Sequence, residues 1–312
     1  MKTLVLAPCT NKKRFSPEVN LMARSLKKGN YDKLASQWSD TLTNSTKEVP
    51  ASELYCGRSF KETFLSAQEL SAHLVIYSAG LGLVEIDKLV PPYNLTVARG
   101  MPDSIGSRLS NAIWDEATWW ASIKKMPNFK CDLQKLFEEK KPSSILIVMS
   151  SSYLNMIRDE LLNLDAYWIE KIRIFGFGLE KKLPEKYVKN LMPYDDRLNG
   201  PDTDIPGTQA DFSARALRHF VGLHGKSKII SSISEDAELV KKTINQWKFP
   251  APIKRLIQSD AEIKSFINKN WDLVEGRSGK MLRFYRDSGF ACEQSRFAHL
   301  FRSALDAKGK QQ

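Results

Sequence analysis

The sequence predicts an α/β fold, in which helices flank a mostly parallel sheet, followed by a basic helical C-terminal region. Short apolar runs alternate with segments of helical spacing up to about residue 250, and such runs are absent beyond it. The composition, 42 % hydrophobic and 27 % charged, is that of an ordinary globular protein. The 312 residues correspond to about two domains, which we place at residues 1–250 and 251–312.

Four apolar runs are the predicted strands of the sheet. They lie at residues 1–8, 73–78, 144–149 and 169–175. Helical segments separate these runs, so right-handed crossovers are expected to join most of the strands in parallel.

Apolar residues at helical spacing predict the helices that lie between these strands. The segments are residues 21–38, 105–126, 154–164 and 212–224, together with 51–70, which is amphipathic and expected to be helical at its later end. Residues 39–50 and 194–211 are expected to be loops. The second holds five aspartates, two prolines and two glycines, and loops of that length in compact domains are usually functional or disordered.

The C-terminal region is predicted to contain short helices. They are expected at residues 260–270, 279–285 and 292–307, with a turn at 287–289 between the last two. Two short helices joined by a glycine turn are typical of helix-turn-helix-like DNA readers. Arg283, Arg286 and Arg296 are then the expected DNA contacts. A helical cap on the sheet is the alternative interpretation of the same pattern.

The charge of the chain predicts a polyanionic partner. Residues 1–30 carry a net charge of +6 and residues 251–312 carry +5, which together account for the surplus of +11. Basic surfaces bind nucleic acid by displacing the counterions of its phosphates, and Lys12 and Arg14 are expected to contribute at the N-terminal end. A solvated basic surface without a partner is the alternative.

Several classes of protein are excluded by what the sequence lacks. The four cysteines are scattered and the four histidines show no metal spacing, so neither a disulfide scaffold nor a metal site is expected. No phosphate-binding GxxxxGK[ST] loop occurs, and no cofactor is expected. No apolar run approaches the ~20 residues of a membrane helix. A cytoplasmic monomer with reduced thiols is the expectation.

Polar residues at the carboxyl ends of the predicted strands are the candidate ligand-binding residues, because ligands of open α/β sheets bind there. They are Cys9, Thr10, Asn11, Lys12 and Lys13 after the first strand, Ser78 with the turn residues Ala79, Gly80 and Gly82 after the second, Ser150, Ser151 and Ser152 after the third, and the turn residues Gly176 and Gly178 after the fourth. Hydroxyls, turn amides and cations bind phosphate or sugar oxygens. The alternatives are a buried apolar role for Cys9 and a helix cap for Ser151.

Four ordered motifs resemble a known group of proteins. The chain reads CTNKK at 9–13, ELYCGRSF at 53–60, YSAGLGLV at 77–84 and PY at 92–93. Residues 1–100 resemble YaaA-like proteins and relatives of the 7-deazaguanine and archaeosine transglycosylases, which carry CT-x-x-K, LY-x-G-x-x-F, SA-x-x-GL and PY-D. The resemblance implies a pocket containing Cys9, Thr10, Lys13, Tyr55, Phe60, Ser78, Ala79 and Tyr93. Two positions depart from the pattern: Asn94 replaces the acid of PY-D, and Gly80-Leu81 replaces a basic residue.

The full-length layout, with the tail LRFYRDSGFACEQ at 282–294, is similar to defence-associated DNA glycosylases that remove glucosylated cytosines from phage DNA. This similarity implies an enzyme that flips a modified base, such as glucosylated hydroxymethylcytosine, out of double-stranded phage DNA and hydrolyses its N-glycosidic bond. Tyr55 or Tyr93 would stack on the base, Ser78 would bind its edge, and Lys13 would hold a flanking phosphate.

Such hydrolysis needs a carboxylate that orients water and stabilises a cationic sugar. Glu53 is the first candidate and Asp196 the second, with Asn11 as a further catalytic candidate; an aspartate in a loop is also a common turn former. Two other functions stay open. One is a transglycosylase or base-modifying enzyme acting on tRNA, and the other is a non-catalytic DNA-binding stress protein.

Overall fold

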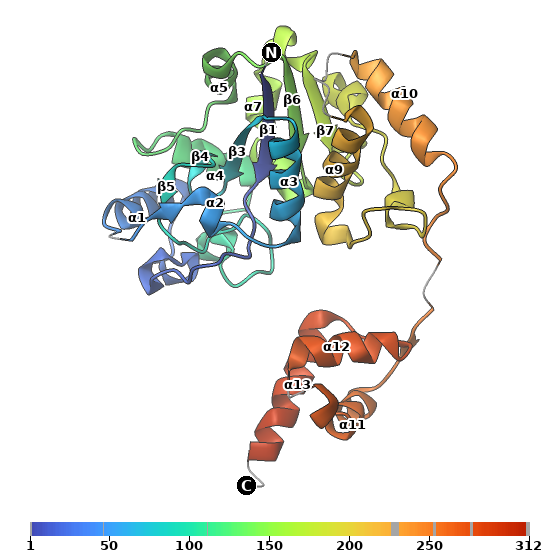
Figure 1. The fold of residues 1–312 in the computed structure, drawn as a ribbon. Coiled ribbons are helices and arrows are strands. Elements are labelled where there is room, and N and C mark those ends of the chain that lie inside the picture. Colours follow the sequence, from blue (N-terminus) through green and yellow to red (C-terminus); the bar gives the residue numbers. More distant parts are fainter. Residues whose placement is uncertain are drawn as a thin grey trace. The chain divides into compact units, whose positions relative to one another are not determined.

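The computed structural model describes residues 2–45, 47–110, 112–225, 231–251, 254–274 and 277–309. Met1 and Asn111, which fall within predicted elements, lie outside the described residues. The chain divides into two compact units, Met1–Pro250 and Ala251–Gln312, and the division falls where the sequence pattern changes (Figure 1). Among the helices of the described ranges, none has the length and apolar character needed to span a bilayer.

The N-terminal unit is built on a five-stranded sheet of order β4-β3-β1-β6-β7 (Figure 1). Its parallel strands are β1 (Thr3–Pro8), β3 (His73–Ser78), β6 (Ser144–Val148) and β7 (Ile172–Phe175). The edge strand β4 (Gly82–Glu85) runs antiparallel to β3. The predicted α/β class with a mostly parallel sheet is confirmed.

The central strands are buried on both faces, which explains their continuous apolar sequences. Val5 of β1 and Ile145 and Leu146 of β6 have no exposed surface, and each such side chain stabilises the fold by about 1.5–3 kcal/mol. From the central strand β1 the chain passes first to β3 on one side and later to β6 on the other. The strand order therefore reverses at β1, and the carboxyl ends of β1 and β6 are where a ligand is expected.

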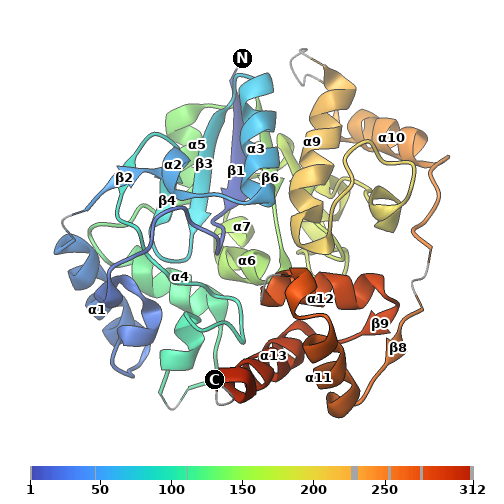
Figure 2. The ribbon, with the colours of Figure 1, turned by 60° about the horizontal axis from the view of Figure 1, so that its bottom comes forward.

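Ten α-helices of the N-terminal unit flank this sheet or connect its strands. They are α1 (Tyr31–Thr43), α2 (Ala51–Leu54), α3 (Arg58–Glu69), α4 (Glu116–Lys124), α5 (Leu133–Lys140), α6 (Ser151–Met156), α7 (Arg158–Leu162), α8 (Ala166–Ile169), α9 (Phe212–His224) and α10 (Ile233–Ile244) within the described residues. Helices α3 and α9 pack side by side over one face of the sheet, and α4 packs against α1 and α6 (Figures 1 and 2). The two-residue strands β2 (Val49–Pro50) and β5 (Leu89–Val90) pair with each other.

Two predicted helices are wrong in part. At the start of the segment 21–38 lie the end of the 3-10 helix Val19–Leu21 and the 3-10 helix Ala23–Ser25, and α1 begins only at Tyr31. Its start is set by Asn30, whose side chain accepts a hydrogen bond from the backbone N–H of Lys33 at 2.9 Å.

The segment 105–126 likewise begins with a 3-10 helix, Ile105–Arg108, and α4 begins after Asp115. This aspartate caps the helix by accepting from the backbone N–H of Thr118 at 2.8 Å. In both segments, apolar spacing before the cap reflects side chains that an irregular chain buries, such as the fully buried Ile105.

Two further boundaries differ from the prediction. The helix expected at 154–164 is divided at Ile157 into α6 and α7. The strand expected at 169–175 begins at Ile172, because α8 extends to Ile169.

The C-terminal unit contains α11 (Asp260–Lys269), α12 (Ser278–Asp287) and α13 (Gln294–Gly309), with β8 (Leu256–Ile257) parallel to β9 (Phe290–Ala291). It has an apolar core of its own, in which Ile263, Tyr285 and Phe297 are fully buried. The predicted turn after α12 is present, and Gly289 adopts a φ of +90°, which favours glycine. The short strand β9 stands between this turn and α13.

Candidate functional site

The carboxyl ends of β1 and β6 meet at a pair of buried polar side chains. Cys9 follows β1, and its Sγ lies 2.9 Å from the hydroxyl of Tyr153, which α6 supplies after β6. Tyr77, at the end of β3, packs edge-on against Tyr153 with 5.6 Å between ring centroids. Its hydroxyl donates to the carbonyl of Val148 at 2.5 Å. Burial raises the pKa of both tyrosines, so their hydroxyls stay protonated at neutral pH.

Three residues from separate motifs form a second hydroxyl cluster beside the first. The hydroxyl of Tyr93 lies 3.0 Å from that of Tyr55 and 2.6 Å from Oγ of Ser78. Each of the three is at most 1 % exposed. The structure thus brings together residues that stand up to 38 positions apart in sequence. Stacking on a base needs an accessible ring face, and neither tyrosine offers one in this structure.

Lys13 covers this cluster on its outer side. Its Nζ lies 4.3 Å from the ring centroid of Tyr93 and 6.0 Å from that of Tyr55, and it donates to the carbonyl of Thr10 at 3.1 Å. Desolvation lowers the pKa of the ammonium from its usual value. The backbone of Cys56 holds the loop that carries Lys13. Its N–H donates to the carbonyl of Lys12, and its carbonyl accepts from Oγ1 of Thr10.

A cavity of about 130 Å³ adjoins Lys13 and is the candidate site. Its polar lining is Asn11, Lys13, Arg24, Asn94, Thr96 and Asp103. Asn11 is exposed at the rim. Asn94 stands where the PY-D motif has its acid, so the motif itself supplies no carboxylate. The carboxylate that lines the cavity is that of Asp103, which comes from a different segment of the chain.

Asp103 is a buried carboxylate that sequence reasoning missed. Burial alone raises the pKa of this carboxyl, but hydrogen bonds from Arg24 lower it below its usual value. The Nε of Arg24 donates at 2.8 Å, and the backbone N–H donates at 3.2 Å. The carboxylate is therefore ionised at neutral pH. The sequence around it, GMPDS, is typical of a solvent-exposed turn, and nothing in it distinguishes Asp103 from a turn-forming aspartate.

The glycine turn after β3 fixes Tyr93. Oγ of Ser78 accepts from the backbone N–H groups of Gly80 and Leu81, each at 3.1 Å. The indole N–H of Trp38 donates to the carbonyl of Gly80 at 2.7 Å. A Cβ on Gly80 would lie 2.7 Å from the ring of Tyr93, closer than side chains tolerate.

Substituting Gly80→Ala is therefore expected to destabilise the N-terminal unit by about 1–3 kcal/mol, the usual cost of overpacking a core. Urea unfolding followed by tryptophan fluorescence measures this change. The matched control is Gly222→Ala on α9, where a Cβ meets nothing within 4 Å and should raise stability by about 1 kcal/mol. A G80A protein as stable as the unsubstituted chain would contradict the close approach.

The two carboxylates favoured by sequence do not line this cavity. Glu53 is exposed on α2. Asp196 begins a 3-10 helix, and its carboxylate accepts from the side-chain amide of Asn199 at 2.7 Å.

Three other predicted site residues have structural partners. Phe60 packs against the ring of Tyr55 with 6.0 Å between centroids, and the hydroxyl of Ser151 accepts from Nζ of Lys182 at 2.8 Å. Ala79 is fully buried, and its carbonyl accepts from the indole of Trp119.

The residues predicted to contact DNA differ in their exposure and in the partners of their side chains. Lys12 and Arg14 are exposed on either side of Lys13. In the C-terminal unit the side chain of Arg283 is 87 % exposed and lies 3.8 Å from Asp287. Arg286 donates to the carbonyl of Cys292, and Arg296 pairs with Asp260. Of these three, Arg283 is best placed to reach a phosphate.

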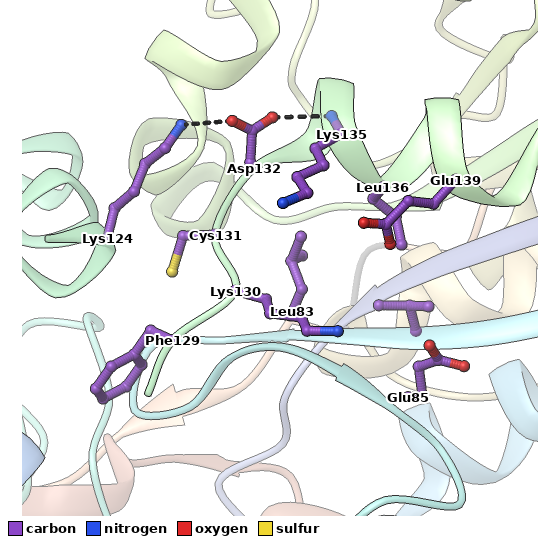
Figure 3. A pocket seen from close by; sticks show the side chains of 11 residues that line it. Leu83, Glu85, Lys124, Phe129, Lys130, Cys131, Asp132, Lys135, Leu136 and Glu139 are labelled. Carbon is purple, nitrogen blue, oxygen red and sulfur yellow. Dashed lines mark hydrogen bonds and ion pairs between the residues drawn. The ribbon is translucent and has the colours of Figure 1, made fainter. Parts of the chain in front are cut away.

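A larger cavity of about 350 Å³ lies beside the edge strand β4 (Figure 3). Three lysines and three carboxylates line it over an apolar floor that includes Leu83 and Leu136. Lys124 lies 3.3 Å from Asp132 and 2.7 Å from Glu160, so part of this charge is neutralised internally. The cavity adjoins the sheet edge rather than the carboxyl ends of β1 and β6, and it contains none of the residues of the candidate site.

Comparison with known families covers part of the chain. Residues 39–119 match the model of a family of unknown function, DUF6884. The matched stretch is about a quarter of the chain and includes Tyr55, Ser78, Tyr93 and Asp103. No curated protein and no solved structure matches the chain.

Proposed function

We propose that this chain is a DNA glycosylase that excises a modified base from phage DNA in antiviral defence, with glucosylated hydroxymethylcytosine as the base implied by the resemblance. The observation that carries the proposal is the meeting of the resembling motifs at a buried hydroxyl cluster, which Lys13 covers beside a cavity that holds an ionised carboxylate. Lys13, Tyr55, Ser78 and Tyr93 come from all four motifs, and Asp103 lines the cavity that Lys13 borders.

The size of the cavity suggests which part of a nucleotide it accepts. At about 130 Å³ it is smaller than the 300–1,000 Å³ of usual small-molecule pockets, so it suits one ring rather than a whole nucleotide. We assign it to the deoxyribose of a nucleotide extruded from the duplex. The base would then lie toward the exposed rim near Asn11, and the buried tyrosines would support Lys13 rather than stack on the base.

Hydrolysis of the N-glycosidic bond develops positive charge on the sugar, which a fixed carboxylate stabilises. Asp103 lies in the cavity and is held ionised by Arg24, so we assign to it the role that sequence analysis gave to Glu53 or Asp196. It would orient the attacking water and face the cationic sugar. The amides of Asn11 and Asn94 line the same space and offer hydrogen bonds to sugar and phosphate oxygens.

Phosphate contacts would come from exposed cations near the cavity and from the C-terminal unit. Lys12 and Arg14 flank Lys13 in the loop, and the side chain of Arg24 is 51 % exposed. Arg283 adds an exposed cation from α12. These cations lie in the two stretches that carry the surplus charge of the chain.

The proposal is tested with duplexes that carry plain, hydroxymethylated or glucosylated hydroxymethylated cytosine at one position. We expect alkali-labile strands and a free base, identified by mass spectrometry, from the modified duplexes and none from the plain duplex. Intact strands in every substrate would overturn the proposal. Incorporation of a labelled base into tRNA, without release of base from DNA, would instead identify the transglycosylase alternative.

A further inference from the structure

Lys13 differs from the other lysines of the candidate region because its amine is enclosed. Its Nζ donates to the backbone carbonyl of Thr10 and lies over the ring of Tyr93. It forms no ion pair with a carboxylate of the described residues. The neighbouring Lys12 is exposed. Desolvation of the amine outweighs the opposing charge interactions with Cys9 and Asp103, so the pKa of Lys13 is lowered and the amine loses its proton more readily than a surface lysine.

The amine also lies where a reactive sugar would be left. Lys13 and Asp103 line the same cavity. This is the cavity that we assign to the deoxyribose of the extruded nucleotide. Removal of the base converts that sugar into an abasic deoxyribose, whose open-chain form is an aldehyde at C1′. Neutral lysine amines form Schiff bases with such carbonyl groups.

We propose that Lys13 is a nucleophile that attacks C1′ of the abasic sugar and gives the protein an abasic-site lyase activity. The inference rests on the proposed function, because that function places the sugar in the cavity. The rings of Tyr93 and Tyr55 then shield the amine from water, and the carbonyl of Thr10 holds the amine at the cavity by accepting its hydrogen bond.

The steps balance without a cofactor. The lone pair of Nζ adds to C1′, and the carbinolamine takes one proton from solvent and loses one water to give a protonated imine. Solvent water takes the C2′ proton, the C2′–H electrons form a C1′=C2′ double bond, and the π electrons of the imine return to the nitrogen to give an enamine. The nitrogen lone pair then re-forms the C1′=N bond, the C1′=C2′ electrons form a C2′=C3′ double bond, and the C3′–O bond breaks with its electron pair leaving on the 3′ phosphate. Hydrolysis of the unsaturated imine consumes one water and restores the amine of Lys13.

The test uses abasic duplex made beforehand from uracil-containing DNA by a separate uracil glycosylase, so that base release by this protein is not needed. Incubation of the full chain with this duplex and sodium borohydride is expected to reduce the imine to a covalent protein–DNA adduct. Peptide mass spectrometry of the wild-type adduct should locate the link at Lys13. An adduct at another lysine, or no adduct, would overturn the inference whether or not any variant folds.

A matched pair of variants extends the test. Lys13→Arg keeps the positive charge over Tyr93 but removes the amine, and we expect loss of the adduct and of strand cleavage. Lys61→Arg, at an exposed position of α3 that does not line the cavity, should leave both at the wild-type level, and thermal melting checks that both variants fold. An adduct formed equally by K13R would contradict the role of Lys13.

The two proposals fail in different ways. Release of a modified base without an adduct on the abasic duplex would remove the lyase inference and leave the glycosylase proposal standing. An adduct on the abasic duplex without base release from any modified duplex would overturn the glycosylase proposal, while Lys13 remained a nucleophile toward abasic sugar.

Discussion

Replacing Asp103 by asparagine is expected to slow base release from modified DNA by about 10²–10⁴-fold, the usual contribution of a positioned acid–base group. The substitution keeps the size of the side chain and removes the negative charge that faces the cavity. Single-turnover release of the base, with enzyme in excess over duplex, measures the chemical step without product dissociation.

Two controls separate this role from a structural one. DNA binding by D103N should be no weaker than that of the wild type, because Asp103 repels rather than binds phosphate. Glu53→Gln removes a carboxylate that is exposed and does not line the cavity, and it should change the rate little. A large loss in E53Q together with a small loss in D103N would return the water-orienting role to the residue that sequence analysis preferred.

Replacing Arg215 by methionine is expected to destabilise the N-terminal unit by about 3–5 kcal/mol, the cost of breaking a buried ion pair. Arg215 on α9 is fully buried, and its Nε donates to Asp211 at 2.7 Å. The guanidinium also donates to the carbonyls of Leu198, Ile205 and Thr208 and to the side chain of Asn199. Urea unfolding at neutral pH measures the loss.

Arg218, one turn further along α9, supplies the matched control. Its side chain is 29 % exposed and pairs with Glu69, so Arg218→Met should cost about 1 kcal/mol or less. Arg215→Lys should recover only part of the stability, because one ammonium cannot reach acceptors arranged around a planar guanidinium. Equal losses of unfolding free energy in R215M and R218M would show that the loop 194–211 does not depend on the buried Arg215.

The sheet was largely predictable because parallel strands are buried on both faces and their sequences are continuously apolar. Residues 73–78 form β3 as predicted, and 212–224 form α9. The edge strand β4 was not predicted, because it follows β3 after a turn so short that Ser78 pairs with Gly82. Its first residues belong to the glycine-rich turn, and no separate apolar run marks it.

The rule that ligands bind at the carboxyl ends of strands placed Cys9, Lys13 and Ser78 in one region. The rule does not predict that Tyr55 and Tyr93 are buried, because the ring of a tyrosine in a loop motif can be either exposed or buried. The loop 194–211 was suspected of holding catalytic carboxylates. Instead Asp195 pairs with Arg197 and Asp211 pairs with Arg215, so these charges order the loop itself.

Asp103 shows why the candidate site was only partly predictable. Its ionisation depends on Arg24, which stands 79 residues earlier in the chain. Neither residue belongs to a motif, and local spacing carries no information about a contact between two irregular segments. The fold alone brings them together.

The close approach of Gly80 to Tyr93 limits how this protein can diverge. A side chain at position 80 is tolerated only if position 93 carries a smaller residue, since the missing Cβ and the aromatic ring occupy the same space. Loss of the ring would in turn uncover Lys13 and remove a partner of Ser78. Substitutions at these two positions should therefore occur in pairs, and descendants that carry them should have lost the enclosed amine.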